Sequence, residues 1–105
     1  MRFKCLLLIM CYSTYNKIAK YSSLTNMKEK SLKAVFGIVL KEMREERNLT
    51  QPQLSELSGV DTGYIGTLET GKKMPMLPMI LRLSKGLGIL PGELVNRIAQ
   101  RFDEN

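Results

Sequence analysis

The sequence contains no histidine and only two cysteines, Cys5 and Cys11, among its 105 residues. Without histidine the chain cannot form a Ser-His or Cys-His nucleophile or a histidine-based zinc site. Two thiols are too few for a structural zinc site or a disulfide-dense scaffold. The eight glycines form no complete GxxxxGK[ST], GxGxxG or GxSxG motif, the patterns typical of phosphate-binding loops and nucleophile elbows. We therefore expect a protein that is not an enzyme, uses no metal or cofactor, and works in a reducing cytoplasm.

Positive charge is in excess but unevenly distributed. There are 16 basic and 10 acidic residues, a net charge of +6, which favours a polyanionic partner such as nucleic acid or an anionic membrane surface. Residues 1–26 carry four basic and no acidic residues, whereas residues 27–105 carry 12 basic and 10 acidic residues. The bulk charge therefore says more about the first 26 residues than about the rest of the chain.

The N-terminal segment differs from the remainder and has three possible interpretations. Its apolar run from Cys5 to Cys11 has seven residues, too few to cross about 30 Å of hydrocarbon, and we expect no membrane partner. The segment could be an element that packs on the domain, a loosely ordered or membrane-touching arm, or upstream sequence ahead of a natural start at Met27. We accordingly divide the chain into an N-terminal extension over residues 1–30 and one domain over residues 31–105. The extension could be disordered, or it could result from a misassigned translation start.

From residue 31 onward, apolar residues recur at three- and four-residue spacing, which predicts helices. Stop signals follow at Asn48 and at three glycines (Gly59, Gly71 and Gly88). The predicted helices span residues 32–47 with Ser31 as N-cap, 51–58 after Thr50, 62–70 after Asp61, 77–87, and from Pro91 onward. The inward-facing residues would include Val39, Leu40, Met43, Leu54, Leu57, Ile65, Leu68, Leu83 and Leu87. An all-α domain of five helices is expected.

The segment from Leu49 to Pro75, LTQPQLSELSGVDTGYIGTLETGKKMP, holds two short helices around a tight turn. Such helices are marginal alone and need packing against a third helix, and this arrangement lets the second helix project into a DNA major groove. The segment resembles the helix-turn-helix family of phage Cro and repressor proteins (Xre-like regulators). The matching residues are Leu49, Thr50, Gln51, Leu54, Ser55, Gly59, Val60, Tyr64, Ile65, Leu68, Glu69, Gly71, Lys72 and Pro75, followed by Leu83, Leu87, Gly88 and Pro91 to Leu94. The resemblance covers about residues 36–95 and implies a lambda-repressor-like DNA-binding fold.

The resemblance also implies roles for individual residues. Gln51, at the start of the first short helix, would contact a DNA phosphate, where free amides and the helix dipole favour an anion. Lys72 and Lys73 would meet the DNA backbone after the second helix. The alternative for all three is a solvated surface. Arg44 and Glu69 would form a bidentate structural ion pair that orients the helices.

The residues expected to face DNA bases depart from the family, because Asp61, Thr62, Gly63, Gly66 and Thr67 replace the Arg, Gln, Ser or Asn of many relatives. A threonine can place its methyl group on a thymine methyl group or donate one hydrogen bond. The glycines either permit close approach to DNA or indicate relaxed specificity that relies on DNA shape.

An apolar stripe in the last predicted helix, Leu94, Val95, Ile98 and Phe102, is where the family often forms a dimer. The alternative is that Leu94 and Ile98 pack in the core and Phe102 lies in a frayed tail. We expect a dimeric, sequence-specific regulator of transcription that binds double-stranded DNA, of the restriction–modification controller or phage repressor type. The competing hypothesis is an antitoxin-like module that binds a protein partner, with DNA binding secondary.

Overall fold

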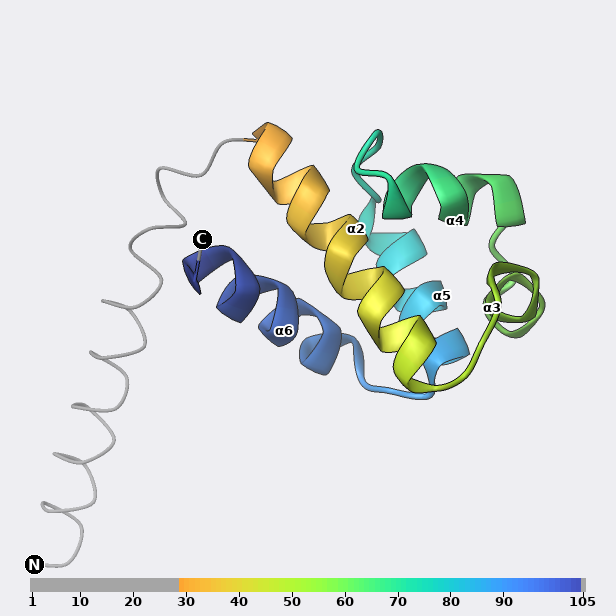
Figure 1. The fold of residues 1–105 in the computed structure, drawn as a ribbon. Helices are drawn as coiled ribbons and strands as arrows, with labels where there is room; N and C mark the ends of the chain where they lie inside the picture. The colour runs from red at the N-terminus through yellow and green to blue at the C-terminus, as the bar shows by residue number, and fades with distance from the viewer. Residues whose placement is uncertain (1–28, 105) are drawn as a thin grey trace, which may run out of the picture.

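The computed structural model describes residues 29–104. The predicted extension over residues 1–30 therefore lies almost wholly outside the described residues, as do Cys5, Cys11 and Met27. The described part contains five α-helices and no strand (Figure 1), which agrees with the predicted all-α fold. The helices are α2 (Glu29–Glu46), α3 (Gln51–Ser58), α4 (Thr62–Glu69), α5 (Leu77–Leu87) and α6 (Pro91–Glu104).

Helix α2 is the central element of the fold. It packs against α4 on one side and α6 on the other, while α3 packs against both α4 and α5 (Figure 1). The predicted start of α2 is wrong, because the helix begins at Glu29 and Ser31 lies in its first turn rather than at its cap. Glu29 and Lys30 are good helix formers, and a glutamate at the first position favours the helix dipole. The predicted stop at Asn48 is confirmed by its φ of 56°.

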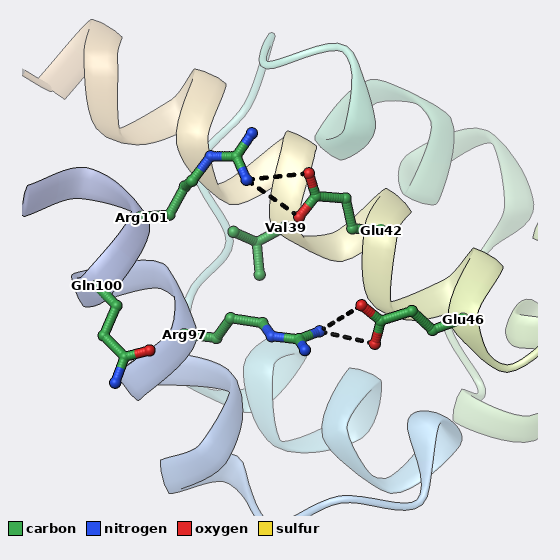
Figure 2. Close-up of a pocket in the computed structure, with 6 residues that line it drawn as sticks. All are labelled: Val39, Glu42, Glu46, Arg97, Gln100 and Arg101. Carbon is green, nitrogen blue, oxygen red and sulfur yellow. Dashed lines mark hydrogen bonds and ion pairs between the residues drawn. The ribbon is translucent and has the colours of Figure 1, made fainter. Parts of the chain in front are cut away.

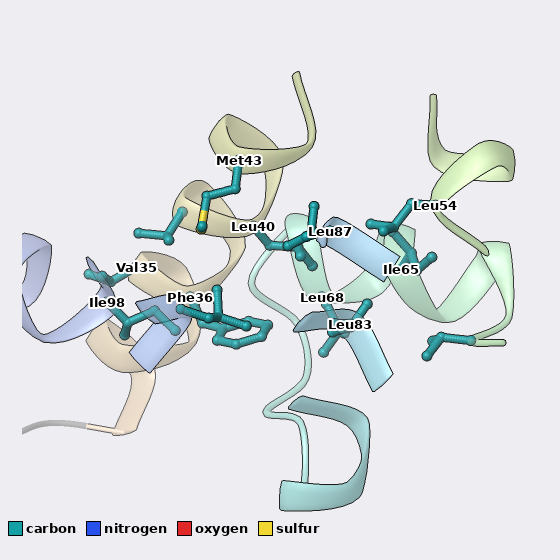
Figure 3. Close-up of a cluster of buried hydrophobic side chains, with 13 residues drawn as sticks. Val35, Phe36, Leu40, Met43, Leu54, Ile65, Leu68, Leu83, Leu87 and Ile98 are labelled. Atoms are coloured by element: carbon teal, nitrogen blue, oxygen red, sulfur yellow. The ribbon is translucent and has the colours of Figure 1, made fainter. Parts of the chain in front are cut away.

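The core draws side chains from all five helices and from one turn (Figure 3). Leu57, predicted to face inward, is 55% exposed. Its neighbour Ser58 is buried instead, and the Ser58 hydroxyl accepts a hydrogen bond from the backbone N–H of Val60 at 3.2 Å. Val60, in the turn after α3, is only 3% exposed and supplies the apolar surface that Leu57 does not. The buried apolar residues are Val35, Phe36, Val39, Leu40, Met43, Leu54, Val60, Ile65, Leu68, Leu83, Leu87, Leu94 and Ile98.

Two glycines that the sequence analysis did not single out set the closest helix crossings. A Cβ atom on Gly37 of α2 would lie 2.4 Å from the carbonyl oxygen of Leu68 on α4. A Cβ atom on Gly86 of α5 would lie 2.7 Å from the Cβ of Ser58 on α3. Both distances are shorter than real Cβ contacts. At Gly37 the backbone of α2 therefore contacts α4 directly, and at Gly86 the backbone of α5 contacts α3 directly.

Ion pairs join α6 to α2 along an open groove (Figure 2). Arg97 Nη1 lies 2.8 Å from Glu46 Oε2, and Arg101 Nη1 lies 3.1 Å from Glu42 Oε1. The hydrogen bond to Glu46 raises the pKa of Arg97. These four side chains are roughly 40–50% exposed, so each pair stabilises the fold by at most about 1 kcal/mol.

Candidate DNA-binding surface

Local sequence signals define both ends of α3 and the start of α4. Thr50 and Gln53 form a capping box: the Thr50 hydroxyl accepts from the Gln53 N–H at 3.2 Å, and the Gln53 side chain accepts from the Thr50 N–H at 2.8 Å. Gly59 ends α3 in the left-handed conformation, with φ of 74°. The carboxylate of Asp61 then caps α4 by accepting from the N–H of Tyr64. Three residues therefore separate the two helices, as the sequence predicts.

A buried ion pair fixes α4 to α2. Arg44 Nε donates to Glu69 Oε1 at 2.7 Å, and Arg44 Nη2 donates to Glu69 Oε2 at 3.2 Å. The side chains are 10% and 4% exposed, respectively. Arg44 Nη1 also donates to the carbonyl of Leu49 at 2.7 Å, which ties the connection between α2 and α3 to the same network. The hydrogen bonds with Glu69 raise the pKa of Arg44 despite the opposing effect of burial. The predicted contact between these residues is therefore present in bidentate form.

The structure adds a third member to this network. Gln51 Nε2, at the first position of α3, donates to Glu69 Oε2 at 2.8 Å. The side chain predicted to meet a phosphate is thus positioned by the carboxylate that also binds Arg44. Gln51 and Glu69 are 18 residues apart, and the sequence analysis did not connect them. Both sit at matching family positions, but their mutual contact depends on how α3 and α4 cross.

The five residues predicted to face bases lie at the start of α4 and on its outer side. Asp61 and Gly63 are exposed, and Thr62, Gly66 and Thr67 are partly exposed. The opposite side of α4 is formed by Ile65 and Leu68, which have no exposed surface. The helix therefore presents one free face of small residues and anchors the other face in the core.

Residues 40–94 match the helix-turn-helix family, a range that spans more than half of the chain. The chain belongs to this family. The match confirms the predicted family, and together with the five helices it confirms the predicted lambda-repressor-like fold. The family groups the chain with DNA-binding transcriptional regulators, which are not an enzyme class.

Three relatives illustrate the similarity. The control protein C.MunI of Mycoplasma sp is 34% identical over 68 residues, covering 64% of this chain and 92% of that protein. The HTH-type transcriptional regulator y4dJ of Sinorhizobium fredii is 30% identical over 64 residues, covering 61% of this chain and 83% of that protein. The crystal structure of the restriction–modification controller protein C.AhdI of Aeromonas hydrophila is 40% identical with a TM-score of 0.57, covering 59% of this chain and 94% of that one.

The two lysines that follow the helix-turn-helix are exposed. Lys73 places its Nζ atom 5.7 Å from the centre of the Tyr64 ring, within the range of a cation–π contact. Tyr64 itself packs against the core. Lys72 and Lys73 thus place two positive charges just beyond the end of α4.

The apolar stripe predicted for α6 divides between the interior and the surface. Leu94 has no exposed surface and Ile98 is 8% exposed. Both side chains therefore belong to the core of the domain and not to a dimer interface, which was the alternative prediction for these two residues. Phe102 is partly buried against the same core. Only Val95, 46% exposed, is a freely accessible apolar side chain among the four.

No helix among residues 29–104 is both long and apolar enough to cross a membrane. Within the same range, no cluster of three or more cysteine, aspartate or glutamate residues could hold a metal ion.

Proposed function

We propose that the protein is a dimeric, sequence-specific transcriptional regulator of the restriction–modification controller type, which inserts α4 into the DNA major groove. The observation that carries the proposal is the free outer face of α4, held in a fixed orientation by the buried Arg44–Glu69 pair. The similarity to C.MunI and C.AhdI, both named as controller proteins, supports this type over a phage repressor.

Affinity for DNA would come from the phosphate backbone. The N-terminus of α3 offers free amide groups and the positive end of a helix dipole. Gln51 lies there with one amide hydrogen bonded to Glu69, which leaves its second amide hydrogen for a phosphate oxygen. Lys72 and Lys73 would contact the backbone on the far side of α4. Neutralising phosphates releases counterions, so binding weakens as salt rises.

A second copy of the chain would bind through the outer face of α6. Around the exposed Val95, this face carries Gly92, Asn96 and Ala99, and Asp103 lies about two turns further along it. The small residues Gly92 and Ala99 allow two helices to pack closely beside Val95. A two-fold dimer places its two recognition helices about 34 Å apart, one turn of DNA. Such a dimer would bind a palindromic site.

Footprinting tests this function on the DNA upstream of the protein's own gene, because small regulators often control their own synthesis. We expect two protected half-sites about one helical turn apart, with protection lost as salt concentration is raised. Absence of protection there and in a genome-wide pull-down would contradict the proposal, as would binding that is insensitive to salt.

The dimer is tested separately by sedimentation. Val95→Asp introduces a charge into the proposed interface and should shift the protein to monomer. Ile38→Asp is the matched control, because Ile38 is a similarly exposed apolar residue, at 41%, on α2. If both variants sediment alike, α6 does not form the interface.

A second candidate is a module that binds a protein partner, as antitoxins do. It is favoured by three exposed apolar side chains near the start of α5, Met76, Leu77 and Leu81, since such residues often mark protein contacts. The neighbouring gene discriminates between the candidates. A nuclease and methyltransferase pair supports the controller, and a toxin gene supports the interaction module.

A further inference from the structure

The polar side chains on the outer face of α4 are largely occupied within the protein. The Asp61 carboxylate caps the helix by accepting from the Tyr64 N–H at 3.3 Å. The Thr67 hydroxyl donates to the Tyr64 carbonyl at 2.7 Å. These bonds leave this face short of hydrogen-bond donors for base edges. Thr67 therefore offers an approaching base mainly its methyl group, and Thr62 offers its methyl group beside a single hydroxyl.

Of the two glycines on the same face, Gly66 has no role in packing that the structure reveals. A Cβ atom on Gly66 would meet only the Gln51 side-chain oxygen, at an ordinary 3.8 Å. A Cβ atom on Gly63 would lie 3.0 Å from Asp61 Oδ2, the oxygen that caps the helix, so Gly63 leaves room for that cap. At Gly37, by contrast, the neighbouring backbone of α4 leaves no room for a side chain. Since glycine weakens a helix interior relative to alanine, Gly66 lowers the stability of α4 without any benefit inside the protein.

We propose that α4 selects its DNA site mainly through thymine methyl groups, with Gly63 and Gly66 allowing the helix backbone to come close enough for this contact. The thymine methyl group is the one apolar feature that base pairs present in the major groove. A face with few free donors and two methyl groups complements that feature better than it complements guanine or adenine. The inference rests on the proposed function, because it concerns how the same surface distinguishes one duplex from another.

The DNA side of the test begins with selection of duplexes from a random library by the full-length chain. The recovered half-site should contain thymines at positions facing α4. Each thymine is then replaced by uracil, which lacks only the methyl group. Loss of one buried methyl contact should raise Kd about fourfold, and replacement outside the half-site should have no effect.

The second part of the test removes the matching methyl group from the protein. Thr62→Ser and Thr67→Ser keep the hydroxyl, so each variant should bind its thymine duplex and the corresponding uracil duplex equally well. Thr70→Ser is the matched control for Thr67→Ser, because the Thr70 hydroxyl also donates to backbone carbonyls, those of Gly66 and Thr67, both at 3.1 Å. Thr70 lies beyond the end of α4, and its variant should keep the full preference for thymine.

Gly66→Ala tests the close approach. The added methyl group fits the free protein, so the melting temperature should stay the same or rise, while Kd for the selected duplex should rise about tenfold or more. Tight binding by this variant overturns the inference, and so does equal affinity of the wild-type protein for thymine and uracil duplexes. A selected half-site without thymine overturns the inference alone, whereas failure to enrich any duplex overturns the proposed function and the inference together.

Discussion

Glu69→Ala should remove a large share of the stability of the domain. The carboxylate accepts three hydrogen bonds, two from Arg44 and one from Gln51. Arg44 cannot turn into solvent without leaving the Leu49 carbonyl that it also binds. Truncating Glu69 therefore leaves a guanidinium group, 10% exposed, without its counter-charge.

The size of this loss in stability follows from the burial of the Arg44–Glu69 pair. Removing one partner of a buried pair costs about 3–5 kcal/mol. A domain the size of residues 29–104 has a total stability of about 4–11 kcal/mol at typical values per residue. With a urea dependence of about 1 kcal/mol per molar for a chain this small, the unfolding midpoint should fall by about 3 M or more.

The assay is urea unfolding followed by the helical circular dichroism signal. Glu46→Ala is the matched control, since it breaks an arginine–glutamate pair with a similar contact distance, 2.8 Å, but with side chains 41% and 50% exposed. That variant should lose about 1 kcal/mol at most. A double variant, Arg44→Met with Glu69→Leu, should recover much of the loss because no unpaired charge stays buried.

Equal losses from Glu69→Ala and Glu46→Ala would refute this reasoning. Such a result would mean that burial does not govern the energetics of these two pairs. The Arg44–Glu69 pair would then contribute no more to the free energy of unfolding than an exposed pair does.

Three further predictions concern packing and charge. Gly37→Ala should unfold the domain or shift α2 away from α4, seen as loss of the cooperative melting transition, whereas Gly66→Ala should melt normally. Leu54→Ala should cost about 2–5 kcal/mol in urea unfolding, and Leu57→Ser should stay within about 0.5 kcal/mol of the wild-type protein because the side chain is exposed; comparable losses would place Leu57 in the core. Lys72→Gln should reduce the slope of log K against log salt by about 0.9 if it neutralises one phosphate, and an unchanged slope would show that it makes no such contact.

The sequence predicts both bounds of α3 and the end of α5 because these are determined locally. Thr50 caps α3, and Gly59 and Gly88 end α3 and α5 in the left-handed conformation. These signals depend on residues a few positions apart. The start of α2 has no such signal, and Ser31, a good cap in isolation, lies inside the helix.

The inward face of α3 was harder to predict because eight residues make barely two turns. Periodicity alone favours Leu57, but the turn after α3 folds Val60 into the core. The choice depends on where the chain goes next, which is tertiary information. The crossings at Gly37 and Gly86 escape periodicity for the same reason.

The candidate site was predicted in part. Arg44 and Glu69 meet as the family resemblance implies, and the five predicted base-facing residues are all accessible. The bond from Gln51 to Glu69 joins residues on different helices and could not be read from spacing. The contacts of these residues with DNA stay predictions.

The contact at Gly37 has a consequence for how this protein could change. Because main-chain atoms meet there, and Ile65 and Leu68 fill the core beneath α4, the posture of this helix does not depend on its outer side chains. The residues at positions 62, 63, 66 and 67 can therefore be substituted together without changing how α4 packs on the rest of the domain. A duplicated gene could acquire a new operator through a few substitutions in this stretch, and an engineer could transplant another regulator's four residues with little loss of stability.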